Sequence, residues 1–240
     1  MRIAVISDIH GNLPALEAVL THIATNNIDQ VICLGDLVDF APWPNEVIER
    51  IRSAYIPLIM GNHDERIAFN LPVAPLAKHG TTETAARIVA IDHSRKVVTA
   101  ANKHFLTTLP RHITLTFNHT QLFFTHASPA SIDEYLYETA GDLLADRLQM
   151  ISTDVMVIGH THLSYTRTIG SRLIVNAGSV GRSKEKDRLA CYAVLTISKT
   201  GEVIPTLVKV AYPVHETVQA IYESGIPNFY GDFLLDRITV

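Results

Sequence analysis

The sequence predicts a mixed α/β fold, and three observations support that prediction. Short apolar runs that are typical of buried strands recur along the chain, at residues 3–6, 31–34, 56–59, 122–124 and 155–158. Helical patterns around residues 14–24 and 44–53 separate the first three runs, which is the order of a βαβαβ unit with a parallel sheet. Beyond residue 110, strand-like segments joined by short turns indicate antiparallel hairpins. We therefore expect a parallel first half and an antiparallel second half.

The first helix has a start signal and an apolar face. Asn12 can cap it, and Pro14 lies in its opening turn. The apolar residues that recur at helical spacing are Leu16, Val19, Leu20 and Ile23. This pattern predicts a helix whose role is packing.

The segment after the third strand run divides into a turn-rich part and a helical part. Residues 62–78 are rich in turn residues, whereas 81–106 is mostly helical, with Thr81 or Thr82 as its cap and Pro110 as its stop. We interpret about 66–110 as a helical insertion that forms either a lid or a dimer surface. A homo-oligomer is therefore one expectation.

The second half is expected to combine hairpins with single helices. A first hairpin over 113–124 turns at residues 117–120. The later elements are expected as a helix at 142–151, strands at 155–158, 163–169, 172–176, 190–197 and 203–210, and a helix at 215–224. Phe229 and Tyr230 should then pack on the surface. Because no repeat or flexible linker interrupts the chain, we expect one domain over 1–240.

Composition excludes several classes of protein. The net charge is −4 with histidine neutral, and no long block of Lys and Arg occurs, so a general nucleic-acid binder is disfavoured. No uninterrupted apolar stretch approaches about 18 residues, and the N-terminal strand run leaves no room for a signal peptide. Cys33 and Cys191 have the pattern of buried thiols. We expect a cytoplasmic protein without a membrane partner.

Polar residues suited to divalent metal ions occur in five short islands, most of them directly after a strand run. In open α/β sheets, ligands bind at the carboxyl ends of the strands, so distant islands can line one crevice. The seven residues are Asp8, His10, Asp36, Asn62, His126, His160 and His162. The sequence therefore predicts a metal site.

Each island alone has a simpler interpretation, such as a polar strand corner, a glycine turn or an ordinary surface histidine. Asp8 and His10 are two apart, so in an extended segment both face the same side. The carboxylate of Asp36 can bridge two cations about 3.5–4 Å apart, and the amide of Asn62 is a neutral ligand where carboxylates already crowd. Glycines permit tight turns at Gly35, Gly61 and Gly159. Only the combination of the five islands predicts a metal site.

The ordered pattern resembles the calcineurin-like metallophosphoesterase superfamily. It consists of Asp8-x-His10, Gly35-Asp36-x-x-Asp39, Gly61-Asn62-His63-Asp64, a lone His126 and Gly159-His160-x-His162. Residues 176–181 and Glu134-Tyr135-Leu136 are similar to the small bacterial and archaeal branch, which contains predicted phosphodiesterases or phosphatases. Ala41 and Ala127 stand where that pattern often has glycine, and neither change removes a ligand.

The resemblance implies a fold, a set of ligands and two further site residues. The fold is a four-layer αββα sandwich of two mixed sheets flanked by helices. One ion would be held by Asp8, His10, Asp36 and His162, and the other by Asp36, Asn62, His126 and His160. His63 would protonate or stabilise the leaving oxygen, with Asp39 bound to its other ring nitrogen. Several close relatives replace His63, so its presence here favours a complete catalytic apparatus.

Nitrogen and oxygen ligands without thiolates suit manganese first, with iron, zinc, nickel or cobalt as alternatives. We expect two such ions to bind the phosphoryl oxygens and to activate a bridging water as the nucleophile. A diester or nucleotide-like substrate is placed slightly ahead of a monoester or phosphoprotein. The rival interpretations are a non-catalytic metal-binding scaffold on the same fold and a nuclease acting on short oligonucleotides.

Two features leave alternatives open. The mixed-charge loop 182–188 is either a solvated hairpin tip or a contact for a substrate phosphate. Trp43 could stack on a base or simply pack against its neighbours.

Overall fold

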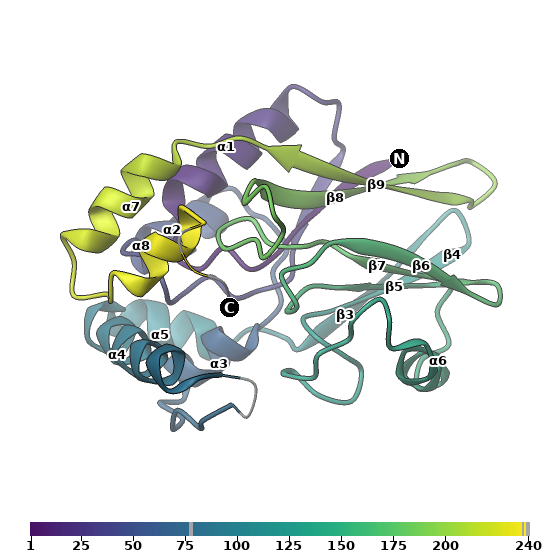
Figure 1. Cartoon of the computed structure of the whole chain (residues 1–240). Coiled ribbons are helices and arrows are strands. Elements are labelled where there is room, and N and C mark those ends of the chain that lie inside the picture. The colour runs from purple at the N-terminus through teal and green to yellow at the C-terminus, as the bar shows by residue number, and fades with distance from the viewer. Residues whose placement is uncertain (77–78, 237, 239–240) are drawn as a thin grey trace.

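Two mixed β-sheets form the centre of the molecule, and helices cover their outer faces (Figure 1). The computed structural model describes residues 1–76, 79–236 and 238. The first sheet has the order β2-β1-β8-β9, with β1 Arg2–Ile6, β2 Gln30–Cys33, β8 Ala190–Ile197 and β9 Val203–Val210. The second has the order β3-β4-β5-β7-β6, with β3 His112–Phe117, β4 Thr120–Thr125, β5 Val155–Ile158, β6 Tyr165–Ile169 and β7 Arg172–Asn176. The predicted fold class is confirmed.

The expected parallel first half is confirmed by β1 and β2, whereas the expected antiparallel second half is only partly right, because β4, β5 and β7 also pair in parallel. β1 pairs with β2 in parallel, and β4, β5 and β7 pair in parallel within the second sheet. The hairpin strands β3 and β9 add antiparallel neighbours, as does β6. The parallel strands β4, β5 and β7 lie inside the second sheet, whereas β2 is an edge strand of the first. In each sheet the carboxyl ends of the parallel strands point to the same edge.

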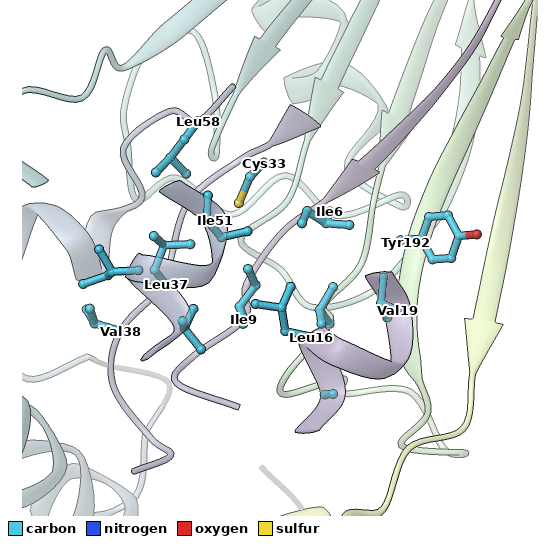
Figure 2. Close-up of a cluster of buried hydrophobic side chains, with 14 of the residues drawn as sticks. Ile6, Ile9, Leu16, Val19, Cys33, Leu37, Val38, Ile51, Leu58 and Tyr192 are labelled. Carbon is cyan, nitrogen blue, oxygen red and sulfur yellow. The ribbon is translucent and has the colours of Figure 1, made fainter. Parts of the chain in front are cut away.

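The central strands are continuously apolar because both of their faces are buried. In β1, Ile3 and Val5 belong to the core between the two sheets, whereas Ala4 and Ile6 belong to the core under the helices. Figure 2 shows the second of these clusters, where side chains from β1, α1 and α2 lie together. Each fully buried aliphatic side chain contributes about 1.5–3 kcal/mol. These cores hold the strand ends in fixed positions.

The first two helices begin and end close to the predicted residues. α1 spans Leu13–Ala24, and its cap is Asn12, whose Oδ1 accepts a hydrogen bond from the Ala15 amide at 3.2 Å. α2 spans Pro44–Ser53. Leu16 and Val19 of α1 are fully buried against the first sheet (Figure 2).

The remaining helices gather in two places. α6 Gly141–Gln149 covers the outer face of the second sheet, where Leu144 and Leu148 pack against Met156. The other helices are α3 Asn62–Ala68, α4 Thr81–Val97, α5 Ala100–Thr107, α7 Val214–Tyr222 and α8 Phe229–Leu234. Figure 1 shows these five at one end of the sheets. The predicted helical stretch 81–106 is thus two helices, and Thr99 caps the second through its hydroxyl.

The predicted third strand at 56–59 is wrong. The structure has only an isolated parallel bridge there, between Cys33 and Leu58. The Cys33 amide donates to the carbonyl of Pro57 at 2.8 Å, and the Ile59 amide donates to Cys33 at 3.1 Å. Pro57 has no N–H to extend the ladder, which restricts the pairing to this short contact. The segment still delivers Asn62 to the edge of the first sheet.

Two further segments also differ from the prediction. The turn-rich segment after residue 61 begins with α3, because the carboxylate of Asp64 accepts a hydrogen bond from the Gly61 amide at 3.1 Å. Tyr230 does not pack on the surface as predicted, since it is buried with Phe233 against Phe40 and Ile221, whereas Phe229 is half-buried. The helix is only six residues long, which is too short for a periodic pattern to indicate burial.

Among the described residues, no helix combines the length and the apolar character that are needed to cross a membrane.

Candidate metal centre

Loops at the strand ends bring the seven predicted residues together. Asp8 and His10 follow β1, Asp36 follows β2, His126 follows β4, and His160 and His162 follow β5, while Asn62 begins α3. All seven side chains are buried, with exposed fractions of at most 7%. Buried acids and imidazoles need partners, because leaving them unpaired costs several kcal/mol.

The backbone of these loops is unusual. Asp8 and His10 have φ values of 55° and 51°, so the predicted extended segment is wrong. Asp36, His160 and His162 are also left-handed, at 54°, 65° and 62°. Non-glycine residues adopt this region at a cost of about 1–3 kcal/mol and persist there only where the surroundings impose it. Here the amides of Asp8 and His10 donate to the carbonyls of Gly35 and Asp36, which fixes both loops.

The three predicted glycine turns have two different causes. Gly35 has a φ of +93°, which only glycine adopts easily, as predicted. Gly61 and Gly159 instead allow a close approach, because a Cβ on Gly159 would lie 2.6 Å from Oδ2 of Asp8. A Cβ on Gly61 would lie 2.8 Å from Cγ of Asp36. Two of the glycines therefore make room for the carboxylates.

The side chains form two groups that can each hold a metal ion. In the first group, Asp8, His10 and His162 present ligand atoms that all lie within 4.8 Å of one another. Nε2 of His162 lies 3.2 Å from Oδ1 of Asp8 and 3.1 Å from Nε2 of His10. The second group consists of Asp36, His126 and His160, again with all ligand atoms within 4.8 Å.

Asp36 connects the two groups. Its Oδ2 lies 3.4 Å from Nε2 of His126 and 3.7 Å from Nε2 of His10. Its Oδ1 accepts a hydrogen bond from the His63 amide at 2.8 Å. Oδ1 of Asn62 lies 3.1 Å from Nε2 of His126, so the amide oxygen faces the second group. One carboxylate oxygen thus lies between two sets of imidazoles.

The outward ring nitrogens of the four histidines fix their tautomers. Each contacts a backbone carbonyl oxygen. Nδ1 of His10 lies 3.0 Å from that of Val38, Nδ1 of His126 lies 2.9 Å from that of Leu34, and Nδ1 of His162 lies 2.7 Å from that of Arg182. Nε2 of His160 lies 3.1 Å from that of Asp133. A carbonyl only accepts, so these nitrogens carry the hydrogen of a neutral ring and the inward nitrogens carry lone pairs. This is the arrangement in metal-binding histidines.

The inward atoms fit a cation. When all four rings are neutral, as metal binding requires, lone pairs of His10 and His162 face each other at 3.1 Å, and those of His126 and His160 face each other at 3.2 Å. Within the described chain, Oδ1 of Asp8 and Oδ2 of Asp36 are buried and accept no hydrogen bond. Divalent ions between these atoms would remove the repulsion and satisfy both oxygens.

The protonation states of the metal-free centre favour cation capture. Burial opposes ionisation of Asp8 and Asp36, yet the facing imidazoles of His162 and His126 hold the pKa of these carboxyls below the usual range. Burial lowers the pKa of His10 and His160 to about 3. Burial also disfavours the charged form of His126, but Asp36 raises its pKa to about 9. Two carboxylates therefore face a single imidazolium, which leaves the centre negative.

His63 and Asp39 form a separate pair beside the two groups. Nδ1 of His63 lies 2.5 Å from Oδ2 of Asp39, and its ring meets that of His10 edge-on at 5.1 Å. Burial raises the pKa of Asp39 to about 7 and lowers the pKa of His63 well below its usual value. Below about pH 7 the proton of Asp39 is thus retained and bonds Nδ1, which leaves the ring hydrogen of His63 on Nε2.

A pocket with a cavity volume of about 60 Å³ opens over the metal-binding groups and His63. The residues of its wall include Phe40, Arg66, Arg87, Arg182, Lys184 and Tyr230. The loop 182–188 was predicted to be either a solvated hairpin tip or a contact for a substrate phosphate. Its start fits the second alternative, because Arg182 is buried and lines the pocket, whereas Lys186 and Asp187 are exposed, which fits the first. Trp43 is half-buried at the start of α2 and is not part of the described lining.

Sequence reasoning missed the residues that position the ligands. The carboxylate of Asp64 accepts hydrogen bonds from the amides of Asp36 and Leu37 at 2.7 and 2.8 Å. The hydroxyl of Ser179 donates to the carbonyl of Asp8, and the amide of Gly181 donates to the same oxygen. The motif position of Asp64 and the resemblance of 176–181 were the signals available.

Comparisons with known proteins agree with this geometry. A family model described as the calcineurin-like phosphoesterase superfamily domain matches residues 1–200. An uncharacterized protein of Methanocaldococcus jannaschii is 30% identical over 249 aligned positions, which cover 97% of this chain and 96% of that protein. A metallophosphoesterase from Sphaerobacter thermophilus has a TM-score of 0.81 at 26% identity and covers 99% of both chains. A hypothetical protein from Pyrococcus horikoshii has a TM-score of 0.83 at 18% identity and covers 97% of both chains.

Proposed function

The chain belongs to the calcineurin-like phosphoesterase superfamily and is a hydrolase of phosphate esters, and on that premise we propose that it works with two divalent metal ions. One ion is held by Asp8, His10, Asp36 and His162, and the other by Asp36, Asn62, His126 and His160. The observation that carries this proposal is the position of Oδ2 of Asp36 between imidazoles of both groups. This oxygen is buried and has no hydrogen bond from any described residue.

Manganese is the first candidate, with iron, zinc, nickel or cobalt as alternatives, because the ligand set contains no thiolate. When bound, such ions supply Lewis-acid activation of a water and neutralise charge on the phosphoryl group. Asp36 connects the ions, and the carbonyl-bound histidines keep their lone pairs aimed inward without rearrangement.

His63 and Asp39 handle the proton. His63 lines the pocket, and its Nδ1 is bonded to Asp39, so Nε2 is the nitrogen that reaches a leaving oxygen. The bond to Asp39 fixes the ring orientation, and general acid catalysis of this kind contributes about 10²–10⁴-fold. Phe40 packs against the His63 ring at 4.8 Å and excludes water from its side.

The substrate is a small phosphate ester, with a diester or nucleotide-like compound ahead of a monoester or phosphoprotein. A scaffold without catalysis is disfavoured because all seven donors and His63 are present and converge. A nuclease of short oligonucleotides is disfavoured by the net charge of −4. Three expectations remain predictions: a cytoplasmic location, a homo-oligomer, and a single domain with residues 66–110 as an insertion. Arg66 and Arg87 lie in this insertion and line the pocket, which supports a lid role for it.

Turnover of p-nitrophenyl esters tests the proposal. We expect the metal-free protein to hydrolyse neither bis-p-nitrophenyl phosphate nor p-nitrophenyl phosphate, and added manganese to restore turnover of at least one. Metal analysis of the active sample should give two ions per chain. If the fully metal-loaded protein turns over neither ester, the result contradicts the proposed hydrolase mechanism and favours a non-catalytic scaffold.

A further inference from the structure

Three arginines line the pocket without a carboxylate partner. Arg66 lies on α3, Arg87 on α4 and Arg182 in the loop after β7, and we call these three the arginine cluster. Across residues 1–76, 79–236 and 238, no carboxylate oxygen lies within 4.0 Å of their guanidinium groups. Three acids also line the pocket, but Asp36 is a proposed metal ligand, Glu83 pairs with His79 and Asp133 accepts a hydrogen bond from Ser131. The wall therefore carries a surplus of positive charge.

Arg182 is the most constrained member of the cluster. Its side chain is 7% exposed, and its Nε is buried without a hydrogen-bond partner in the described part of the chain. Its guanidinium carbon lies 4.8 Å from the ring centre of Phe40, 5.3 Å from that of Tyr230 and 4.7 Å from that of Phe233. Cation–π contacts offset only part of the cost of burying an arginine. A buried cation that contacts only rings and lines a pocket is prepared for an anion.

The arginine cluster adjoins the proposed metal ligands and His63 but is not part of either. Phe40 contacts Arg182 and also the rings of His10 and His63, at 4.9 and 4.8 Å. Arg66 and Arg87 line the same pocket as His63. The carbonyl of Arg182 also holds His162 in place. The cluster therefore surrounds the side of the pocket where a leaving group would lie.

The number of donors exceeds what one phosphoryl group can accept. A phosphate diester has two non-bridging oxygens and a monoester has three, and the proposed ions and His63 already serve this group. Each guanidinium offers five N–H donors in a rigid fork that matches a phosphate or carboxylate. Arg87 already donates one N–H to the carbonyl of Ala74, and the remaining donors of the three forks, which come from separate elements, are enough to bind a further anionic group.

We propose that the arginine cluster binds a second anionic group of the substrate, so that this enzyme prefers phosphate esters with a further phosphate beyond the scissile one. This proposal deepens the proposed function and rests on it. Residues of α8 that hold Arg182 lie beyond residue 200, where the family match ends. The three arginines themselves lie within residues 1–200, so the preference combines side chains of the matched region with aromatic rings outside it.

The test measures binding of two nucleotides to the manganese-loaded protein by calorimetry. Adenosine 3′,5′-bisphosphate and adenosine 5′-monophosphate share one phosphate and differ by the other. We expect the bisphosphate to bind roughly 10- to 100-fold more tightly, which is the range of charge-assisted hydrogen bonds. Arg182→Ala should reduce this ratio to within about threefold, mainly by weakening the bisphosphate.

Arg188→Ala is the matched control, because Arg188 also stacks on Phe233, at 4.2 Å, but pairs with Asp236 and is not in the pocket lining. It should leave the ratio unchanged. Arg182→Lys keeps one charge and most of the packing, so it should fold even where the alanine variant does not, with an intermediate ratio. Equal affinity of the wild-type protein for the two nucleotides overturns the proposal, as does an equal loss for both in Arg182→Ala or Arg182→Lys. Ester turnover, measured separately, decides the proposed function.

Discussion

The floor and the wall of the pocket are built in different ways. The floor consists of the seven residues proposed as ligands, which lie on loops at strand ends and are held by backbone carbonyls and amides. The wall includes long side chains from α3, α4 and the loop 182–188. Ring contacts with α8 hold Arg182, and a hydrogen bond to the carbonyl of Ala74 holds Arg87. Backbone contacts leave little freedom, whereas packed side chains can change one at a time. The floor therefore suits a fixed reaction and the wall suits a variable substrate.

The largest effect should follow a change at the centre of the floor. In Asp36→Asn the neutral amide cannot bridge two cations, so we expect both ions to be lost and kcat/KM to fall by about 10³-fold or more, since the ions supply several kcal/mol. Metal analysis and ester turnover measure this. Asp133→Asn removes the same charge from the pocket lining and should retain both ions. Two ions bound to the Asp36 variant would contradict the bridging role.

A second floor variant separates proton transfer from metal binding. His63→Ala should lower kcat by about 10²–10⁴-fold while two ions remain bound, because His63 is not a proposed ligand. Stopped ester assays and metal analysis on one sample give both values. An unchanged kcat with a full metal complement rules out the role of His63.

The floor should also reject a single methyl group. Gly159→Ala places a Cβ 2.6 Å from Oδ2 of Asp8, so the carboxylate must move and metal affinity should fall by roughly 10–100-fold. Gly80→Ala is the control, because a Cβ there meets nothing within 4 Å. Manganese titration of the two variants measures the difference. Equal affinities would show that the floor is more tolerant than its contacts indicate.

The charges of the floor predict how the metal-free protein responds to pH. Burial disfavours the charged form of His126, but Asp36 raises its pKa from 6.5 to about 9. The contribution of protonated His126 to the stability of the folded protein is therefore fully present below pH 6.5. It is lost as the pH rises through 9, which lowers the free energy of unfolding by at most about 3 kcal/mol. Urea unfolding with chelator at pH 6.5, 7.5 and 9 tests this, with His126→Gln as the control. Stability that stays level or rises over this range is the opposing result.

The smallest effect should follow a change that loosens the wall. Phe233→Leu removes one ring contact from Arg182 and should destabilise the protein by only about 1–2 kcal/mol, with KM rising a few-fold and kcat unchanged. Phe229→Leu alters the same helix without a described contact to Arg182. Thermal unfolding and ester kinetics compare the two variants. A large fall in kcat for Phe233→Leu would show that wall and floor are not separate.

The sequence predicts the floor far better than the wall, and the reason is physical. Strand runs are recognisable because both faces are buried, and the carboxyl ends of parallel strands meet at one edge. That reasoning placed Asp8, Asp36 and His160 together before any coordinates. It failed locally at Asp8 and His10, where a tight left-handed loop, not an extended segment, turns both side chains to the same point.

The wall depends on contacts between distant segments, which leave no periodic signal. Arg182 meets Tyr230 and Phe233 from almost fifty residues further along the chain, and the aromatic segment seemed to be surface packing from its sequence. The predicted strand at 56–59 is wrong for a different reason. Its apolar residues are typical of a strand, but Pro57 has no N–H to extend the ladder of hydrogen bonds, and only an isolated bridge forms.

The bonds from Val180 and Gly181 to Ser7 and Asp8 have a consequence for how the protein acquires its cofactor. The earliest ligands of the chain are braced by a segment that the ribosome makes some 170 residues later, at about 5–20 residues per second. A nascent chain that ends before residue 180 lacks both bonds, so we expect the site to bind metal only after most of the chain has been made. The cell's free metal pool at the moment of completed folding should therefore decide which ions this enzyme carries.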